Sequence, residues 1–100
     1  VNTIREVYFP NVFSPNGDST NDFFNVFGGP GVEGIEFLKI YDRWGNLMFD
    51  GQPTINDRFQ GWDGFFNGKP VNPGVYAWMA DIRFIDDEVI TFSGDLTVLR

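Results

Sequence analysis

The sequence predicts an all-β fold, an immunoglobulin-like antiparallel β-sandwich of about seven strands without a disulfide. Gly and Pro divide the chain into short segments, and no stretch keeps a helical period for three turns. Several segments alternate apolar with polar residues, as strands do when one face of a sheet is buried and the other is wet. One hundred residues make one domain, which we assign to 1–100, and the chain has no Cys.

Strands are expected in six segments, with a further short one near 54–60. The six are 6–13, 23–27, 35–43, 47–50, 74–85 and 88–99. Between the third and the fourth, Gly45 and Asn46 are expected to form a two-residue hairpin turn, because both tolerate positive φ. The region from Gln52 to Asn72 is the longest irregular part of the chain.

The two C-terminal strands show the clearest alternation. Their apolar residues are Tyr76, Trp78, Ala80, Ile82 and Phe84 in the first and Ile90, Phe92, Gly94, Leu96 and Val98 in the second. We place the turn between them at residues 86–88. A hairpin centred on Asp87 keeps both apolar faces on the same side of the sheet. It pairs Phe84 with Ile90, Ile82 with Phe92, Ala80 with Gly94 and Trp78 with Leu96.

Composition argues against several classes of function. The net charge of −7 disfavours binding to nucleic acid or to anionic membrane surfaces, since both repel an acidic protein. No run of about 18 apolar residues is present, so we expect no direct insertion into a membrane. The chain lacks His and Cys, and no carboxylate lies in a recognisable catalytic motif. We therefore expect a domain without enzymatic activity.

The polar loop from Asn16 to Asp22 is the strongest candidate for binding an ion. Its side chains offer the oxygen ligands that Ca²⁺ prefers, and the expected ligands are Asp18, Asn21 and Asp22. The loop departs from the EF-hand template, because Asn21 stands where that template requires Gly. The alternative is a tight turn in which these side chains bond their own backbone and Gly17 adopts positive φ. Calcium is the one cofactor that the sequence suggests.

Two aromatic phrases each allow two interpretations. Arg43 and Trp44 form either an exposed patch for a partner protein or a stacked pair that fixes the end of a strand. Trp62 is either a plug for the end of the sandwich or a platform on which a sugar stacks. If Trp62 is a plug, Asp63 caps backbone amides and Gly64 relieves strain in the turn.

Taken in order, the phrases of this chain resemble those of one known family. They are Pro10-Asn11-Val12-Phe13-Ser14-Pro15-Asn16-Gly17-Asp18, Tyr41-Asp42-Arg43-Trp44-Gly45, Gly61-Trp62-Asp63-Gly64, Gly68-Lys69, Pro73-Gly74-Val75-Tyr76 and a last strand from Gly94 to Leu99-Arg100. The chain is similar to the type B C-terminal domains that direct Bacteroidota proteins, gliding adhesins among them, through the type IX secretion system. Two of the phrases also resemble the immunoglobulin-like domain of flagellar hook-capping proteins, which supports the fold alone.

The resemblance implies that the domain is a sorting signal and not an enzyme. It implies that the folded domain ends a larger protein and is recognised by the type IX translocon or by accessory outer-membrane proteins, with a final location at the cell surface or outside the cell. Recognition is expected at a sheet edge open to β-augmentation or at the loop end of the domain. The residues expected to contact the partner are Asn16, Gly17, Asp18, Arg43, Trp44, Gly94, Leu96, Val98 and Arg100. The alternatives are a cell-surface adhesion or carbohydrate-binding module and a structural spacer.

Overall fold

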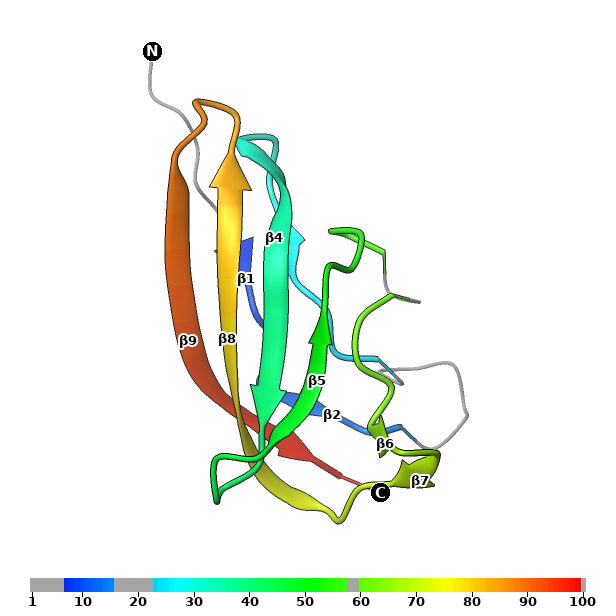
Figure 1. Ribbon diagram of the computed structural model, residues 1–100. Coiled ribbons are helices and arrows are strands. Elements are labelled where there is room, and N and C mark those ends of the chain that lie inside the picture. Colours follow the sequence, from blue (N-terminus) through cyan, green and yellow to red (C-terminus); the bar gives the residue numbers. More distant parts are fainter. Residues whose placement is uncertain (1–6, 16–22, 58–59, 100) are drawn as a thin grey trace.

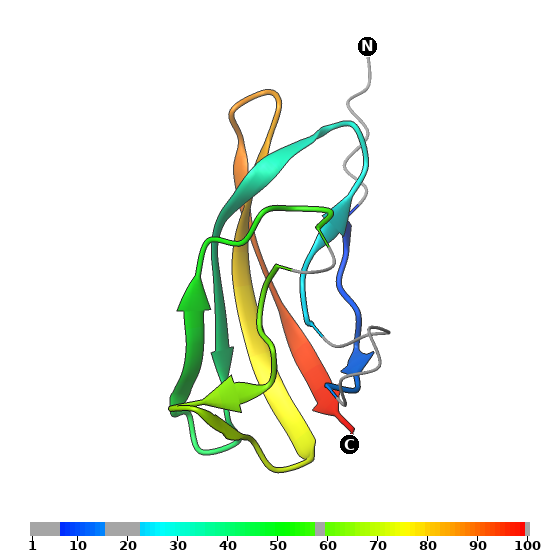
Figure 2. The same cartoon turned by 90° about the vertical axis from the view of Figure 1, so that its right-hand side faces the viewer.

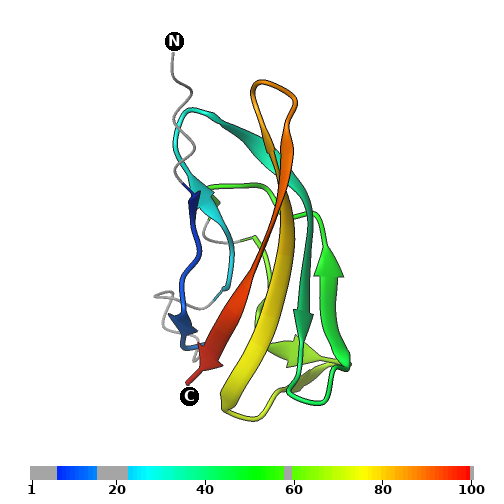
Figure 3. The same cartoon turned by 90° about the vertical axis from the view of Figure 1, so that its left-hand side faces the viewer.

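The computed structural model describes residues 7–15, 23–57 and 60–99 (Figure 1). Within these ranges the chain forms nine strands and no helix, so the predicted all-β fold is confirmed. One long, twisted sheet faces a second layer of short strands and connecting segments (Figures 2 and 3). In these ranges no helical segment is present that has the length and apolar character needed to cross a membrane.

The main sheet contains five strands in the order β2-β9-β8-β4-β5. Its centre consists of β4 (Val32–Tyr41), β8 (Gly74–Phe84) and β9 (Val89–Val98), and β5 (Leu47–Gly51) forms one edge. At the other edge, β2 (Val12–Phe13) pairs in parallel with the end of β9, whereas the other pairs are antiparallel. The last four predicted long strands are therefore confirmed, with small shifts at their ends.

Outside the main sheet the chain is less regular than the sequence predicts. The remaining strands form two small sheets, β1 (Val7–Tyr8) with β3 (Phe27–Gly28), and β6 (Phe65–Phe66) with β7 (Lys69–Pro70). The predicted strand 6–13 is divided into β1 and β2, because the chain passes from the small sheet to the main sheet at Pro10, which has no N–H to donate.

The segment near 54–60 forms no strand at its described positions, 54–57 and 60. Side-chain hydrogen bonds hold it in place instead. The buried Asn25 donates from Nδ2 to the carbonyls of Thr54 (2.7 Å) and Asp57 (2.8 Å). Asn56, with a φ of 65°, exchanges hydrogen bonds with the backbone of Gly28 through both ends of its amide. Because these two asparagines satisfy the backbone groups, strand pairing is not required there.

The core lies between the main sheet and the segments that face it. Every second residue of β8 is buried there, as the alternation predicts: Tyr76, Trp78, Ala80, Ile82 and Phe84. Aromatic rings from the second layer cover them. Phe9 stacks on Trp78 with 4.0 Å between ring centroids, and Trp62 meets Tyr76 edge-on at 5.5 Å. Each buried ring removes about 150–250 Å² from water, which helps a short chain to build a core without disulfides.

The register of the β8–β9 hairpin differs from the prediction by two residues. The observed pairs are Ile82–Ile90, Ala80–Phe92, Trp78–Gly94 and Tyr76–Leu96. The four predicted pairs are therefore wrong. A shift by two nevertheless leaves every side chain on its predicted face, because side chains alternate with a period of two.

The turn explains this shift. The loop consists of Ile85, Asp86 and Asp87, one residue earlier than predicted, and it is closed by a 2.9 Å hydrogen bond from the Phe84 N–H to the Glu88 carbonyl. Asp87 adopts a φ of 67°, as the last residue of a three-residue hairpin loop commonly does.

Candidate functional site

The side chain of Trp62 belongs to the core and not to an exposed surface. Trp62 is 1% exposed, and its Nε1 donates to the carbonyl of Phe65 at 3.0 Å. Asp63 Oδ1 accepts from the N–H of Phe65 at 3.0 Å, which is the predicted amide cap, and Gly64 has a φ of 78°. The interpretation of Trp62 as a plug is confirmed, and its interpretation as a sugar platform is wrong.

Trp44 is the exposed member of the three tryptophans, all of which lie in the described ranges. Its exposed fraction is 74%, whereas Trp62 and Trp78 are buried. Several exposed and coplanar tryptophan rings would favour the alternative of a carbohydrate-binding module. One exposed tryptophan does not form such a set, so the observation that would favour a carbohydrate-binding module is missing.

The loop that carries Trp44 joins β4 to β5 and differs from the predicted turn. It contains three residues, Arg43, Trp44 and Gly45, because the Asp42 N–H donates to the Asn46 carbonyl at 2.9 Å and closes the hairpin there. Gly45 has a φ of 85°, and Asn46 is not in the positive-φ region. The predicted two-residue Gly45-Asn46 turn is therefore wrong, since this loop needs positive φ at one residue and not at two.

Asp42 fixes the shape of this loop. Its carboxylate accepts hydrogen bonds from the Asn46 side chain (3.0 Å), the Asn46 N–H (2.8 Å) and the Trp44 N–H (2.9 Å). These bonds, that from the Asn46 side chain foremost, lower the pKa of the Asp42 carboxyl. Hydrogen bonds within the loop, and not burial, therefore position Trp44.

Arg43 and Trp44 form a stacked pair on the surface. The guanidinium carbon of Arg43 lies 4.5 Å from the centroid of the Trp44 ring, within the range of a cation–π interaction. Both residues are exposed. The two interpretations of this pair are therefore compatible, because the stack is present and remains accessible to a partner.

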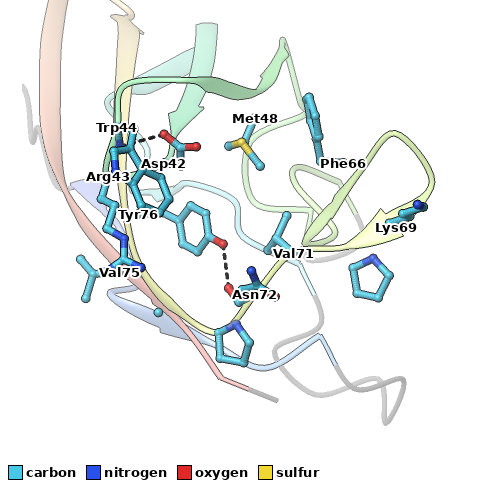
Figure 4. Close-up of a pocket in the computed structure, with 13 residues that line it drawn as sticks. Asp42, Arg43, Trp44, Met48, Phe66, Lys69, Val71, Asn72, Val75 and Tyr76 are labelled. Atoms are coloured by element: carbon cyan, nitrogen blue, oxygen red, sulfur yellow. Dashed lines mark hydrogen bonds between the residues drawn. The ribbon is translucent and has the colours of Figure 1, made fainter.

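The stacked pair borders a groove with a volume of about 350 Å³ (Figure 4). In Figure 4, Arg43 and Trp44 from the β4–β5 loop lie on one side, and Phe66 and Lys69 from the β6–β7 hairpin lie on the other. Between them is Tyr76, whose hydroxyl donates to the carbonyl of Asn72 at 2.7 Å. The groove therefore brings together three segments that are distant in the sequence.

The sequence analysis missed the β6–β7 side of this groove. Phe66 and Lys69 are paired across a tight turn formed by Asn67 and Gly68, which have φ values of 53° and 79°. Asn-Gly between two short strands is a strong hairpin signal, because that turn needs positive φ at both residues. This signal would have placed Phe66 opposite Lys69, but it would not have placed either beside Trp44.

The partner-binding residues expected in the last strand have their side chains in or against the core. Leu96 and Val98 are both 0% exposed. Gly94 lies beneath the ring of Trp78, and a Cβ at Gly94 would be 2.9 Å from Trp78 Cζ2. These three residues can reach a partner only through their backbone. Since β8 and β4 lie between β9 and β5 in the sheet, the last strand and the Trp44 loop form two separate surfaces.

Part of the outer edge of β9 has no partner strand in the described part of the chain. The Thr97 N–H donates outward, to the Asn11 carbonyl at 2.8 Å, beside the short pairing with β2. Because outward and inward groups alternate along a strand, the N–H and C=O groups of Thr91, Ser93 and Asp95 also point outward. β2 does not reach these three residues.

The predicted ion-binding loop lies outside the described residues, as does the end of the chain. The predicted residues concerned are Asn16, Gly17, Asp18, Asn21, Asp22 and Arg100. Calcium binding by this loop therefore stays a prediction. Within the described ranges, no group of three or more acidic side chains is placed to hold a metal ion.

Comparison with known protein families gives one match that covers most of the chain. The family is described as the CHU_C type IX secretion signal domain, and the match extends over residues 7–98. It therefore includes the β-strands, the Trp44 loop and the groove. Neither the curated proteins nor the solved structures contain a match.

Proposed function

The chain belongs to the CHU_C type IX secretion signal domain family, and on that premise we propose that it acts as a folded sorting signal bound by the translocon or by accessory outer-membrane proteins. The family match over residues 7–98 carries this proposal. A signal of this family marks the protein that contains it for export to the cell surface or to the outside. The family consists of sorting signals and not of enzymes, so the property to explain is recognition.

Two exposed features of the folded domain support its recognition by a partner protein. A signal shared by different exported proteins must present its own binding feature, whatever protein precedes it. Among the described residues, the edge of β9 from Thr91 to Asp95 has no partner strand, so its outward backbone groups are available for β-augmentation. The exposed Trp44 is a residue type favoured at the centre of protein interfaces.

The proposal is tested by export of a fluorescent reporter that carries this domain at its C-terminus. The host is a gliding bacterium with, or without, a functional type IX translocon. We expect the reporter outside the cell only when the translocon is present. Retention of the reporter in the cells that have the translocon, with the fused domain shown to be folded, would contradict the proposed function.

A separate variant tests the edge of β9. Ser93→Pro removes an N–H that points outward and leaves the bonds to β8 in place, and proline is tolerated on edge strands for that reason. Phe92→Pro removes an inward N–H and is the control for damage to the fold. If the edge pairs with a partner, Ser93→Pro stops export while thermal stability stays close to that of the unaltered domain.

Normal export of a folded Ser93→Pro domain would exclude β-augmentation at this edge. Deletion of residues 94–100 is a weaker test, because it removes Leu96 and Val98 from the core. Loss of export would then reflect loss of the fold as readily as loss of the edge.

A further inference from the structure

We propose that the groove between the β4–β5 loop and the β6–β7 hairpin binds an extended acidic peptide segment of the secretion machinery, in which an apolar side chain adjoins the carboxylate. This inference rests on the proposed function and adds to it the binding surface and the chemistry of the partner. Three properties of the groove support it: a backbone edge that no described strand covers, two cations that form no ion pair with a described residue, and exposed apolar side chains.

This backbone edge is at Val75, which lines the groove. β8 pairs with β4 as far as Ala77, which lies opposite Tyr41, and β4 ends there. Val75 also lies opposite Thr97 of β9, at a position where the backbone groups point away from β9. The N–H and C=O of Val75 are therefore directed toward the groove side, beyond the end of β4. An extended peptide can add a short strand at this point.

The two cations are Arg43 and Lys69, one on each side of the groove (Figure 4). Neither forms an ion pair with another described residue, whereas Arg83 pairs with Glu36 on the sheet. The acidic residue that lines the groove is Asp42, and its carboxylate is occupied by three hydrogen bonds within its own loop. The charged groups of the groove that remain available to a ligand are therefore the N–H donors of Arg43 and Lys69.

This local charge is the reverse of the overall charge. The chain has 14 Asp and Glu against seven Lys and Arg, yet two bases and one acid line the groove. Charge complementarity thus favours a carboxylate on the partner. At physiological salt, charges more than about 8 Å apart at the surface are largely screened, so acidic residues far from the groove repel a bound carboxylate only weakly.

Apolar side chains complete the groove. Trp44 is 74% exposed, Val75 is 56% exposed and Phe66 is 42% exposed. An apolar side chain of the bound peptide, next to its carboxylate, would cover these surfaces while the carboxylate meets Arg43 or Lys69. A volume of about 350 Å³ suits the side chains of one extended segment and not the insertion of a folded element.

Binding is tested directly with an array of short overlapping peptides that cover the exposed segments of the translocon and its accessory proteins. Each acidic peptide is also made with its Asp and Glu residues replaced by Asn and Gln. We expect the unaltered domain to bind peptides that place an acidic residue beside an apolar one. Removal of the peptide's charge, or the Lys69→Glu change in the domain, should weaken binding at least about tenfold, the size of one charge-assisted hydrogen bond.

Lys39→Glu is the matched control, since it makes the same change in net charge. Lys39 lies on β4 over the ring of Phe37 and does not line the groove. We expect peptide binding and reporter export to be retained in Lys39→Glu and lost in Lys69→Glu. Equal binding and equal export by the two variants would overturn the inference while leaving the sorting function in place.

Val75→Pro separates the backbone contact from the charge. It removes the N–H that faces the groove, and thermal unfolding establishes that the variant is folded. Loss of peptide binding by the folded variant supports strand addition at Val75, and unchanged binding overturns it. Failure of the unaltered domain to direct translocon-dependent export overturns the proposed function, and this inference with it.

Discussion

Gly61→Ala is expected to remove a large part of the stability of this domain. Gly61 has a φ of 98°, and a Cβ at this position would lie 2.1 Å from the carbonyl oxygen of Phe24. That oxygen accepts a hydrogen bond from the Trp62 N–H at 3.0 Å, and the Phe24 N–H donates to the Trp62 carbonyl at 2.8 Å. Because the obstacle is backbone, the alanine can be accommodated only if this bridge opens.

The size of the effect follows from two contributions. A residue with a Cβ in the left-handed region costs about 1–2 kcal/mol. The two hydrogen bonds of the Phe24–Trp62 bridge contribute about 0.5–1.5 kcal/mol each. We therefore expect Gly61→Ala to lower the free energy of unfolding by about 2–5 kcal/mol, against a total of about 5–15 kcal/mol for a typical domain.

Urea unfolding followed by tryptophan fluorescence measures this loss, since Trp62 and Trp78 are buried. Two glycines serve as controls. Gly68 has a φ of 79° but no atom within 4 Å of the added Cβ, so Gly68→Ala should cost only about 1–2 kcal/mol. Gly34 has neither positive φ nor a close atom, and Gly34→Ala should be neutral or slightly stabilising. Equal losses for Gly61→Ala and Gly68→Ala would refute the role assigned to the Phe24 contact.

Three further predictions concern the aromatic residues and the Asp42 loop. Trp62→Ala should lower the free energy of unfolding by about 3–5 kcal/mol, and Trp44→Ala by less than about 1 kcal/mol, because the Trp62 ring is buried and the Trp44 ring is exposed. Urea unfolding of both variants measures these losses. Similar losses would contradict the assignment of Trp44 to the surface. Gly94→Ala should displace the Trp78 ring from Phe9 and lower the free energy of unfolding by about 1–3 kcal/mol. The near-ultraviolet circular dichroism spectrum should change with it. An unchanged spectrum and an unchanged stability would contradict close packing of Gly94 against the Trp78 ring. Asp42 has a lowered pKa in the folded state, so its stabilisation is present above the unfolded pKa of about 3.9 and is lost as the pH falls through the folded pKa. The difference in Tm between the unaltered domain and Asp42→Asn should therefore shrink on acidification, and a difference that does not depend on pH would contradict this.

The two hairpins of the main sheet show how far a sequence pattern determines register. The alternation from Tyr76 to Phe84 assigns the buried face of β8 correctly, because burial acts on each residue separately. The partner across the strand depends on the loop, and both hairpins close with three-residue loops whose last residue, Gly45 or Asp87, has positive φ. A register shifted by two residues satisfies the same alternation, so the pattern alone did not distinguish the observed register from the predicted one.

At the candidate site, too, the sequence predicted the local contacts of single residues. The composition of the sequence excluded disulfide and thiolate chemistry, and the Trp-Asp-Gly phrase predicted the buried plug formed by Trp62. The stacked Arg43–Trp44 pair was also among the interpretations made from the sequence, because neighbouring residues in a tight loop have few arrangements. Local contacts of this kind are encoded within a few residues and can be read from them.

What the sequence by itself determined is the all-β class, the buried faces of the long strands and the local turns that hold Trp62. Only the tertiary structure decided that Trp44, Phe66, Lys69 and Val75 line one groove. These residues belong to three segments that are far apart in the chain, and their spacing does not predict that they meet. They meet because the first residues of β8 extend past the end of β4 at Tyr41, and the β6–β7 hairpin lies on the other side of the groove that forms there. This arrangement depends on how the layers pack and not on any local preference of the residues.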